Sequence, residues 1–315
     1  MANLKELAKT IPERLTCGHR LCPGCGASIA ARQILMGTSD PVVIANATGC
    51  LEVATTIYPY TAWNTPWIHN AFENAAATIS GVEAAYVGLK KQGKIPKDKE
   101  IKFLAFAGDG GTYDIGLQAL SGALERGHNF VYVCYDNEGY MNTGIQRSSA
   151  TPKGAHTTTS PPGKVSYGKK QERKDLAMIV AAHGIPYVAQ ASVGNHHDLI
   201  AKAKKAFEVD GPAFINVFAP CQRGWRHIPS DTLKLGKMAI ETTFWPLFEV
   251  FDGKVWKINY KPKERLPISE FLKVQGRFKH LQEDKNKHIV DEIQQDIDNK
   301  WNFLLKLEAA TQPEE

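Results

Sequence analysis

The central part of the chain, from about Pro41 to Pro220, alternates short apolar runs rich in β-branched residues with longer segments of helical periodicity. Each run is followed by polar residues or glycine, which is typical of strands that end at a turn. The pattern predicts strands at residues 42–45, 101–106, 130–135, 186–189 and 213–218. It predicts helices near 70–90, 114–127, 172–183 and 196–208, with Asn195 as N-cap of the last.

This alternation predicts an α/β fold with a doubly wound, mostly parallel sheet, which binds ligands at the carboxyl ends of its strands. We assign residues 1–40 to an N-terminal segment, 41–230 to the α/β domain and 231–315 to a C-terminal extension. In the extension, residues 248–251 and 254–258 flank Asp252-Gly253 and predict a hairpin. Apolar residues spaced by four predict an amphipathic helix over 285–307, whose stripe packs rather than faces a membrane.

One long connection, residues 148–170, has no periodic apolar face and is rich in Pro, Gly, Ser and Thr. A loop of this length inside a compact domain is usually functional or mobile. Its lysines, Lys164, Lys169 and Lys170, are expected to form a solvated surface.

The composition and charge distribution of the chain exclude several classes of protein. The 315 residues are 43% apolar, enough for a large core, and the 38 basic and 33 acidic residues are interspersed at a net charge of +5. Because no basic stripe stands out, we do not expect a nucleic-acid binder. There is neither a signal-peptide core nor an apolar run of ~20 residues, so we expect a cytoplasmic chain without a membrane segment.

Six cysteines are the first chemical feature. A cytosolic protein keeps thiols reduced, so clustered cysteines there more often bind metal than form disulfides. Cys22-Pro23-Gly24-Cys25 is a tight turn that aims two thiolates at one site, and both zinc and iron–sulfur centres use such pairs. Cys50 and Cys221 follow the first and last predicted strands, whereas Cys134 lies within a strand and is expected in the core. The residues alone leave zinc and iron–sulfur open. They also leave Cys17 undecided, because Cys17, Cys22 and Cys25 imitate the C-x₄-C-x₂-C run of plant-type ferredoxins.

An acidic glycine turn is the second feature. Gly108-Asp109-Gly110-Gly111 joins a strand to a helix, where glycines let the backbone approach a phosphate. It is not the dinucleotide fingerprint, because Tyr113 occupies the third glycine position. An aspartate there repels a diphosphate unless a hard cation lies between them, and Mg²⁺ takes oxygen ligands. We therefore predict a magnesium site formed by Asp109, the Asn137 side chain and the main-chain oxygen of Gly139.

These motifs together identify a resemblance that covers about residues 14–230. Cys22-x-x-Cys25, Thr48-Gly49-Cys50-Leu51-Glu52, the segments 66–75 and 108–116, and Tyr135-Asp136-Asn137-Glu138-Gly139-Tyr140-Met141-Asn142-Thr143-Gly144 resemble the β subunit of pyruvate:ferredoxin oxidoreductase and its 2-oxoacid relatives. The resemblance implies a thiamine-diphosphate-binding fold, bound Mg²⁺ and a [4Fe–4S] cluster held by Cys22, Cys25, Cys50 and Cys221. It implies that Asn142 faces the substrate as the catalytic residue and that the cofactor contacts are Gly49, Cys50, Gly108, Asp109, Gly110, Gly111, Asn137, Gly139, Met141 and Asn142.

The implied activity is the oxidative decarboxylation of a small 2-oxo acid, with electrons passing through the cluster to ferredoxin. Pyruvate, with coenzyme A as acceptor, is the main expectation, and oxalate without coenzyme A is the alternative. A non-oxidative thiamine-dependent decarboxylase and a non-catalytic metal scaffold are further alternatives. Since the chain has one Gly-Asp-Gly domain, partner subunits of a hetero-oligomer would supply the pyrimidine-binding domain and ferredoxin-like clusters.

Overall fold

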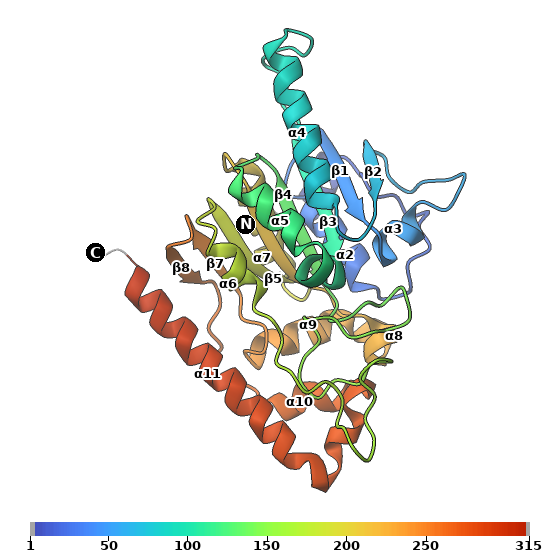
Figure 1. Cartoon of the computed structure of the whole chain (residues 1–315), viewed down its shortest axis with the longest axis vertical. Helices are drawn as coiled ribbons and strands as arrows, with labels where there is room; N and C mark the ends of the chain where they lie inside the picture. The colour runs from blue at the N-terminus through green and yellow to red at the C-terminus, as the bar shows by residue number, and fades with distance from the viewer. Residues whose placement is uncertain (1–3, 313–315) are drawn as a thin grey trace.

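The computed structural model describes residues 4–312 and is built on one eight-stranded sheet with the order β2-β1-β3-β4-β6-β5-β7-β8 (Figure 1). The first six strands in this order run parallel, and β7 and β8 are antiparallel. The strands are β1 (Val42–Ala47), β2 (Trp67–Asn70), β3 (Lys102–Gly108), β4 (Val131–Asp136), β5 (Tyr187–Ser192), β6 (Ala213–Phe218), β7 (Phe248–Phe251) and β8 (Val255–Ile258). All the strands predicted from the sequence are present, and β2, with only four residues, escaped prediction.

Helices cover both faces of the sheet, because the central strands are apolar on both sides. One core lies between the sheet and helices α2 (Gly26–Leu35) and α7 (His196–Glu208). The core on the opposite face includes residues of α4 (Ala75–Lys91), α5 (Leu117–Glu125), α6 (Leu176–Ala181) and α11 (Lys287–Thr311). The doubly wound α/β fold is therefore confirmed, and Cys134 is fully buried in the second of these cores, as predicted.

Helix boundaries differ from the sequence pattern at two places. The segment predicted as one helix over 114–127 is a π-helical turn, Gly110–Ile115, followed by α5. The helix predicted at 172–183 is limited to α6, because the Asp175 side chain caps it by accepting a hydrogen bond from the Met178 amide at 3.2 Å. The N-cap at Asn195 is confirmed, since its side chain accepts from the Asp198 amide at 3.2 Å. Outside the C-terminal extension, the helices that were not predicted are α1 (Leu4–Thr10), α2, α3 (Cys50–Thr55) and α8 (Gln222–Trp225).

The C-terminal residues extend the sheet. The β7–β8 hairpin turns at Asp252 and Gly253, which both have positive φ (52° and 65°), as the predicted Asp-Gly turn requires. Its strand β7 pairs antiparallel with β5, so residues beyond 231 continue the same sheet. The α11 stripe is buried, with Ile289, Ile293, Ile297 and Trp301 at most 8% exposed, which confirms its packing role. Helices α9 (Thr232–Glu241) and α10 (Ile268–Lys273) and 3₁₀ turns at Pro229–Asp231, Gly276–Gln282 and Asp284–Asn286 complete the extension.

The long connection between β4 and α6 is held against the body of the protein. The expectation of a solvated lysine surface is wrong for Lys169, which is 1% exposed, although Lys164 and Lys170 are exposed. The Lys169 Nζ donates to the carbonyl oxygens of Ser149 and Glu172, each at 3.3 Å, and to that of Thr151. Three main-chain acceptors thus replace water around this ammonium group, which explains how the loop accommodates a buried charge.

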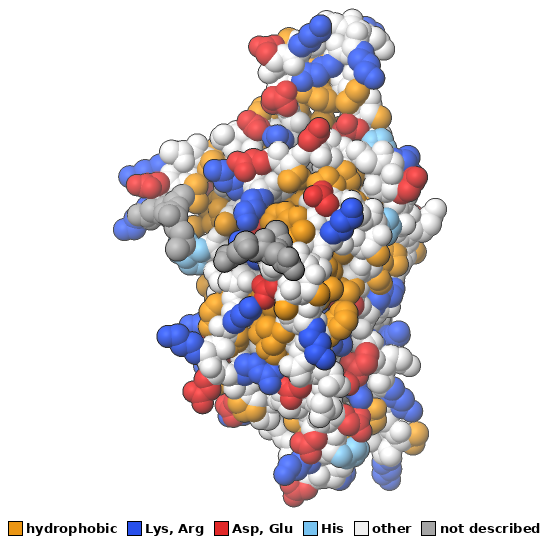
Figure 2. Space-filling view, turned by 90° about the vertical axis from the view of Figure 1, so that its left-hand side faces the viewer, with side chains coloured by type: hydrophobic (Ala, Val, Ile, Leu, Met, Phe, Trp, Pro, Cys, Tyr) orange, Lys and Arg blue, Asp and Glu red, His pale blue; other side chains and the backbone are white. Residues whose placement is uncertain are grey.

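The surface carries charges of both signs. On the face in Figure 2, blue basic and red acidic side chains are scattered around orange hydrophobic side chains in the middle of the view, and α4 projects at the top. Within residues 4–312, no helix has the length and apolar character needed to cross a membrane.

Candidate active site

Four neighbouring strands bring the predicted site residues to one edge of the sheet. Strands β1, β3, β4 and β6 lie side by side and parallel, so their carboxyl ends point to the same side. Cys50 follows β1, Asp109 follows β3, Asn137 follows β4 and Cys221 lies three residues after β6. Residues that are as much as 171 positions apart therefore meet because of the strand order.

Asp109 is fully buried in the turn after β3. Its carboxylate accepts hydrogen bonds from the Ser148 hydroxyl at 2.5 Å and from the Asn137 amide at 3.2 Å. Burial, followed by the negative charge of Asp136, raises the pKa of this carboxyl well above its ordinary value. Among residues 4–312, no basic side chain forms an ion pair with Asp109, so its charge is left for a cation to neutralise.

The Asn137 side chain connects Asp109 to Gly139. One terminal atom of its amide lies 2.8 Å from Asp109 Oδ1 and 2.9 Å from the Gly139 carbonyl oxygen. If this atom is the amide nitrogen, it donates to both oxygens; if it is the oxygen, three oxygens converge and a cation is required. In an octahedral Mg²⁺ shell with Mg–O distances of ~2.1 Å, neighbouring ligand oxygens lie roughly 3 Å apart. The three predicted ligands therefore fit magnesium.

A cavity above these oxygens is lined by glycines that keep side chains out of it. A Cβ atom on Gly110 would lie 2.3 Å from the Tyr140 ring, and one on Gly49 would lie 2.8 Å from the Tyr135 hydroxyl. Every predicted cofactor contact except Asp109 lines this cavity, namely Gly49, Cys50, Gly108, Gly110, Gly111, Asn137, Gly139, Met141 and Asn142. The arrangement suits a ligand that needs close contact with the backbone, such as a diphosphate.

Four of the six cysteines surround a second cavity of about 310 Å³, formed by Cys22, Cys25, Cys50 and Cys221 with apolar and main-chain neighbours. The Cys22–Cys25 turn closes through a hydrogen bond from the Cys25 amide to the Cys22 carbonyl at 3.1 Å. The Gly26 amide donates to the Pro220 carbonyl at 3.1 Å and so fixes this turn beside Cys221. Cys17 is exposed and does not line the cavity.

The chemistry of these thiols fits a cationic centre. Burial raises the pKa of Cys50 to about 12 and that of Cys221 to about 11, and neighbouring cysteines add to both shifts. A bound metal reverses this effect, because thiolates are the form that coordinates. No three His, Cys, Asp or Glu side chains in the described part of the chain are placed to hold a single metal ion. The four thiols instead line one cavity, which leaves room for a cationic centre among them.

The two cavities adjoin. Cys50, Asn137, Met141 and Asn142 line both of them. The predicted substrate-facing residue, Asn142, thus lies between the oxygen ligands and the cysteines, where one loop contacts both groups.

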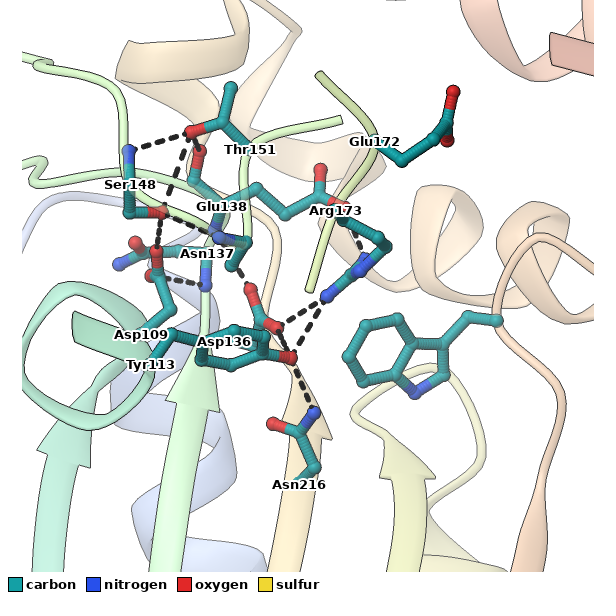
Figure 3. A network of polar contacts seen from close by, with 12 residues as sticks. Asp109, Tyr113, Asp136, Asn137, Glu138, Ser148, Thr151, Glu172, Arg173 and Asn216 are labelled. Atoms are coloured by element: carbon teal, nitrogen blue, oxygen red, sulfur yellow. Dashed lines mark hydrogen bonds and ion pairs between the residues drawn. The ribbon is translucent and has the colours of Figure 1, made fainter. Parts of the chain in front are cut away.

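Charged residues that no sequence motif indicated surround the loop from Asn137 to Gly139 (Figure 3), which we call the metal loop after its candidate Mg²⁺ ligands. Arg173 donates to Asp136 at 2.7 Å and to Glu138 at 2.9 Å, and Arg277 donates to the other oxygen of Glu138. Glu138 is fully buried, which raises its pKa, and the two guanidinium groups oppose that shift. Arg173 and Arg277 belong to no motif, and only their position in the fold assigns them to the site.

The fold and the glycine-lined edge define an α/β thiamine-binding protein, and comparisons agree. The family described as thiamine pyrophosphate enzyme, C-terminal TPP binding domain, matches residues 47–217. Pyruvate synthase subunit PorB of Thermotoga maritima is 55% identical over 98% of this chain and 97% of its own. PorB of Methanocaldococcus jannaschii is 53% identical (91% and 95%), and ketoisovalerate oxidoreductase subunit VorB of Pyrococcus abyssi is 45% identical (96% and 96%).

A solved structure has the same fold. The 2-oxoglutarate:ferredoxin oxidoreductase of Magnetococcus marinus, with 2-oxoglutarate, coenzyme A and succinyl-CoA bound, superposes with a TM-score of 0.54 at 21% identity, over 73% of this chain and 80% of that one. The chain belongs to the family of β subunits of 2-oxoacid:ferredoxin oxidoreductases, which confirms the resemblance seen in the sequence.

Proposed function

We propose that this chain holds thiamine diphosphate, Mg²⁺ and a [4Fe–4S] cluster in a pyruvate:ferredoxin oxidoreductase that uses coenzyme A. The observation that carries the proposal is that the glycine-lined cavity and the cysteine-lined cavity adjoin and share lining residues. The Asn137 side-chain amide lies within 2.9 Å of both the Asp109 carboxylate and the Gly139 carbonyl, and four cysteines surround the adjoining cavity. A non-oxidative decarboxylase needs only the first site and a metal scaffold only the second.

The chain's own residues have distinct tasks in this proposal. Asp109, Asn137 and the Gly139 carbonyl hold Mg²⁺, which neutralises the diphosphate beside a buried carboxylate. The glycines of the 108–111 turn admit the diphosphate to the backbone, and Asn142 orients the substrate. The thiamine ring supplies an electron sink for decarboxylation, and the cluster accepts the released electrons.

The identity of the substrate is supported by relatives rather than by residues of this chain. The relatives compared above that are more than 50% identical are pyruvate synthase subunits, and the ketoisovalerate oxidoreductase subunit is less similar, at 45%. We therefore propose pyruvate, with oxalate as the alternative. Partner subunits complete the site and pass electrons to ferredoxin.

The cluster is tested by iron and acid-labile sulfide analysis, with electron paramagnetic resonance, on the anaerobically purified complex. We expect about four irons at this site per chain, because a cubane uses four cysteines. Cys221→Ser should remove this signal, whereas Cys17→Ser, the matched control outside the cavity, should retain it. Stoichiometric zinc in place of iron, or loss of the cluster only in Cys17→Ser, would contradict the assignment.

A further inference from the structure

The metal loop is clamped by two arginines that lie far from it in the sequence. Glu138 stands between the two candidate ligands Asn137 and Gly139, and its φ of +64° is in the left-handed region, which a non-glycine residue rarely adopts. Such a backbone persists only when its surroundings hold it. Here the Glu138 carboxylate is fixed from both sides, by Arg173 at 2.9 Å and by Arg277.

Arg277 acts on this loop twice. Besides its ion pair with Glu138, its guanidinium lies 3.9 Å from the centroid of the Trp225 ring. The Trp225 indole in turn donates a hydrogen bond to the Asn137 carbonyl at 2.8 Å. Arg277 is 2% exposed, and its Nε donates to the Gln275 side chain at 3.0 Å, so its position is fixed. A residue of the C-terminal extension thus contacts Glu138 directly and, through Trp225, supports the main chain of Asn137.

The two arginines also pair with some of the buried carboxylates and not with others. Asp136 and Glu138, on either side of Asn137, are both engaged by arginines, and Asp136 also accepts from the Tyr113 hydroxyl at 2.6 Å (Figure 3). Their negative charges are neutralised away from the metal. Asp109 and the neutral Asn137 amide are left to face it, which leaves one formal charge on the two side-chain ligands.

We propose that Arg277, with Arg173, is a positioning residue that fixes the Asn137–Gly139 loop for Mg²⁺ and thiamine diphosphate. The inference rests on the proposed magnesium site. It gives residues 231–315 a role in cofactor binding, since η3 (Gly276–Gln282) supplies Arg277. Removing a partner that orients a metal ligand costs about 10- to 100-fold in metal affinity in other proteins.

The test is a Mg²⁺ titration of the assembled, cofactor-depleted complex at a fixed concentration of thiamine diphosphate. Isothermal titration calorimetry measures the binding. Arg277→Met should raise the half-saturating Mg²⁺ concentration about 10-fold or more, and Arg277→Lys should lie between it and the wild type. At saturating Mg²⁺ the turnover number should recover. An unchanged Mg²⁺ requirement in Arg277→Met would overturn the inference.

A matched control is Arg265→Met, because Arg265 belongs to the same extension but pairs with Asp298 at 2.8 Å and does not contact the loop. It should bind Mg²⁺ as the wild type does. The Asp109→Ala variant distinguishes failure of the proposed magnesium site from failure of the proposed role of Arg277. If it leaves Mg²⁺ binding unchanged, the metal site itself is wrong; if it abolishes binding while Arg277→Met has no effect, only the clamp is wrong.

A double variant covers the case in which Arg277→Met fails to assemble. Arg277→Met combined with Glu138→Gln removes both charges, so no unpaired carboxylate is left buried by the loss of Arg277. We expect this variant to assemble and still to require about 10-fold more Mg²⁺. Wild-type Mg²⁺ affinity in the double variant would show that Arg277 only neutralises charge and would refute positioning.

Discussion

At the scale of single residues, the metal loop is surrounded by buried charged side chains. Asp109, Asp136 and Glu138 are fully buried carboxylates, and Arg173, Arg277 and Lys169 supply cations near them. Buried ion pairs add little net stability, since desolvation offsets their attraction, but losing one partner costs about 3–5 kcal/mol. Such a network therefore serves placement more than stability, and each member is sensitive to substitution.

The lowered pKa of Lys169 can be tested through the pH dependence of the free energy of unfolding. Burial, then the charges of Arg147 and Arg173, lower the pKa of Lys169 from 10.5 to about 8, while Glu138 and Asp114 oppose the shift. Between pH about 8 and 10.5 the unfolded chain binds the proton that the folded chain has lost, so the free energy of unfolding rises with pH.

We expect the free energy of unfolding to rise with pH in the wild type but not in Lys169→Met, which lacks the titrating group. Below pH about 8 the Lys169 ammonium group is charged, and the full cost of burying it persists. Denaturant unfolding of the reduced chain from pH 7 to 10.5 measures the difference. Lys170→Met, at the neighbouring exposed position, should follow the wild-type curve. Equal pH slopes for wild type and Lys169→Met would contradict the lowered pKa.

At the scale of elements, α11 anchors the C-terminal extension to the rest of the fold. Its Ile289, Ile293 and Ile297 belong to the core that also contains Trp225 and Phe278, next to Arg277. Its Trp301 reaches the core of the sheet. The helix therefore supports the element that carries the arginine clamp.

Ile293→Ala should lower the free energy of unfolding by about 2–4 kcal/mol, because it removes buried apolar volume and leaves a cavity. Phe303→Ala, on the exposed side of the same helix where Phe303 is 55% exposed, should change it by less than about 1 kcal/mol. Guanidinium titration of both variants measures the effect. Equal losses for the two variants would contradict the packing of α11.

At the scale of the whole molecule, one sheet edge collects residues from almost the entire chain. The cysteine turn at residues 22–25, the Asp109 turn, the Asn137 loop and Cys221 meet there, and Arg277 supports them from the extension. The same edge carries one Gly-Asp-Gly turn, which by the proposed function is half of a thiamine site. We propose that partner subunits complete it.

We therefore expect the isolated chain to be inactive and the assembled complex to reduce viologen with pyruvate and coenzyme A. Omitting coenzyme A is the control, since the acetyl group then has no acceptor. Faster reduction with oxalate alone would establish the alternative substrate, and faster reduction with ketoisovalerate would reassign the substrate class. Activity of the isolated chain would contradict the half-site interpretation.

The sequence by itself determined the hairpin and every strand except β2, and it predicted the candidate ligands. Apolar periodicity and Asp252-Gly253 are local signals, and they placed β1, β3, β4, β5, β6 and the β7–β8 turn. Asp109, Asn137, Cys22, Cys25 and Cys50 were predicted because each lies in a short motif with its own chemistry, whereas Cys221 was predicted as a cluster ligand only through the family resemblance. Lys169 was misjudged, because burial of a lysine depends on distant carbonyl groups that no local pattern contains.

Only the tertiary structure decided which residues act together. The folded chain places Cys50 and Cys221 around one cavity and joins that cavity to the Asp109 site, and neither follows from spacing along the chain. It also brings Arg277 to Glu138 across 139 positions. A hydrogen bond or an ion pair depends on distance in space, and periodicity in the sequence determines elements but not their packing partners.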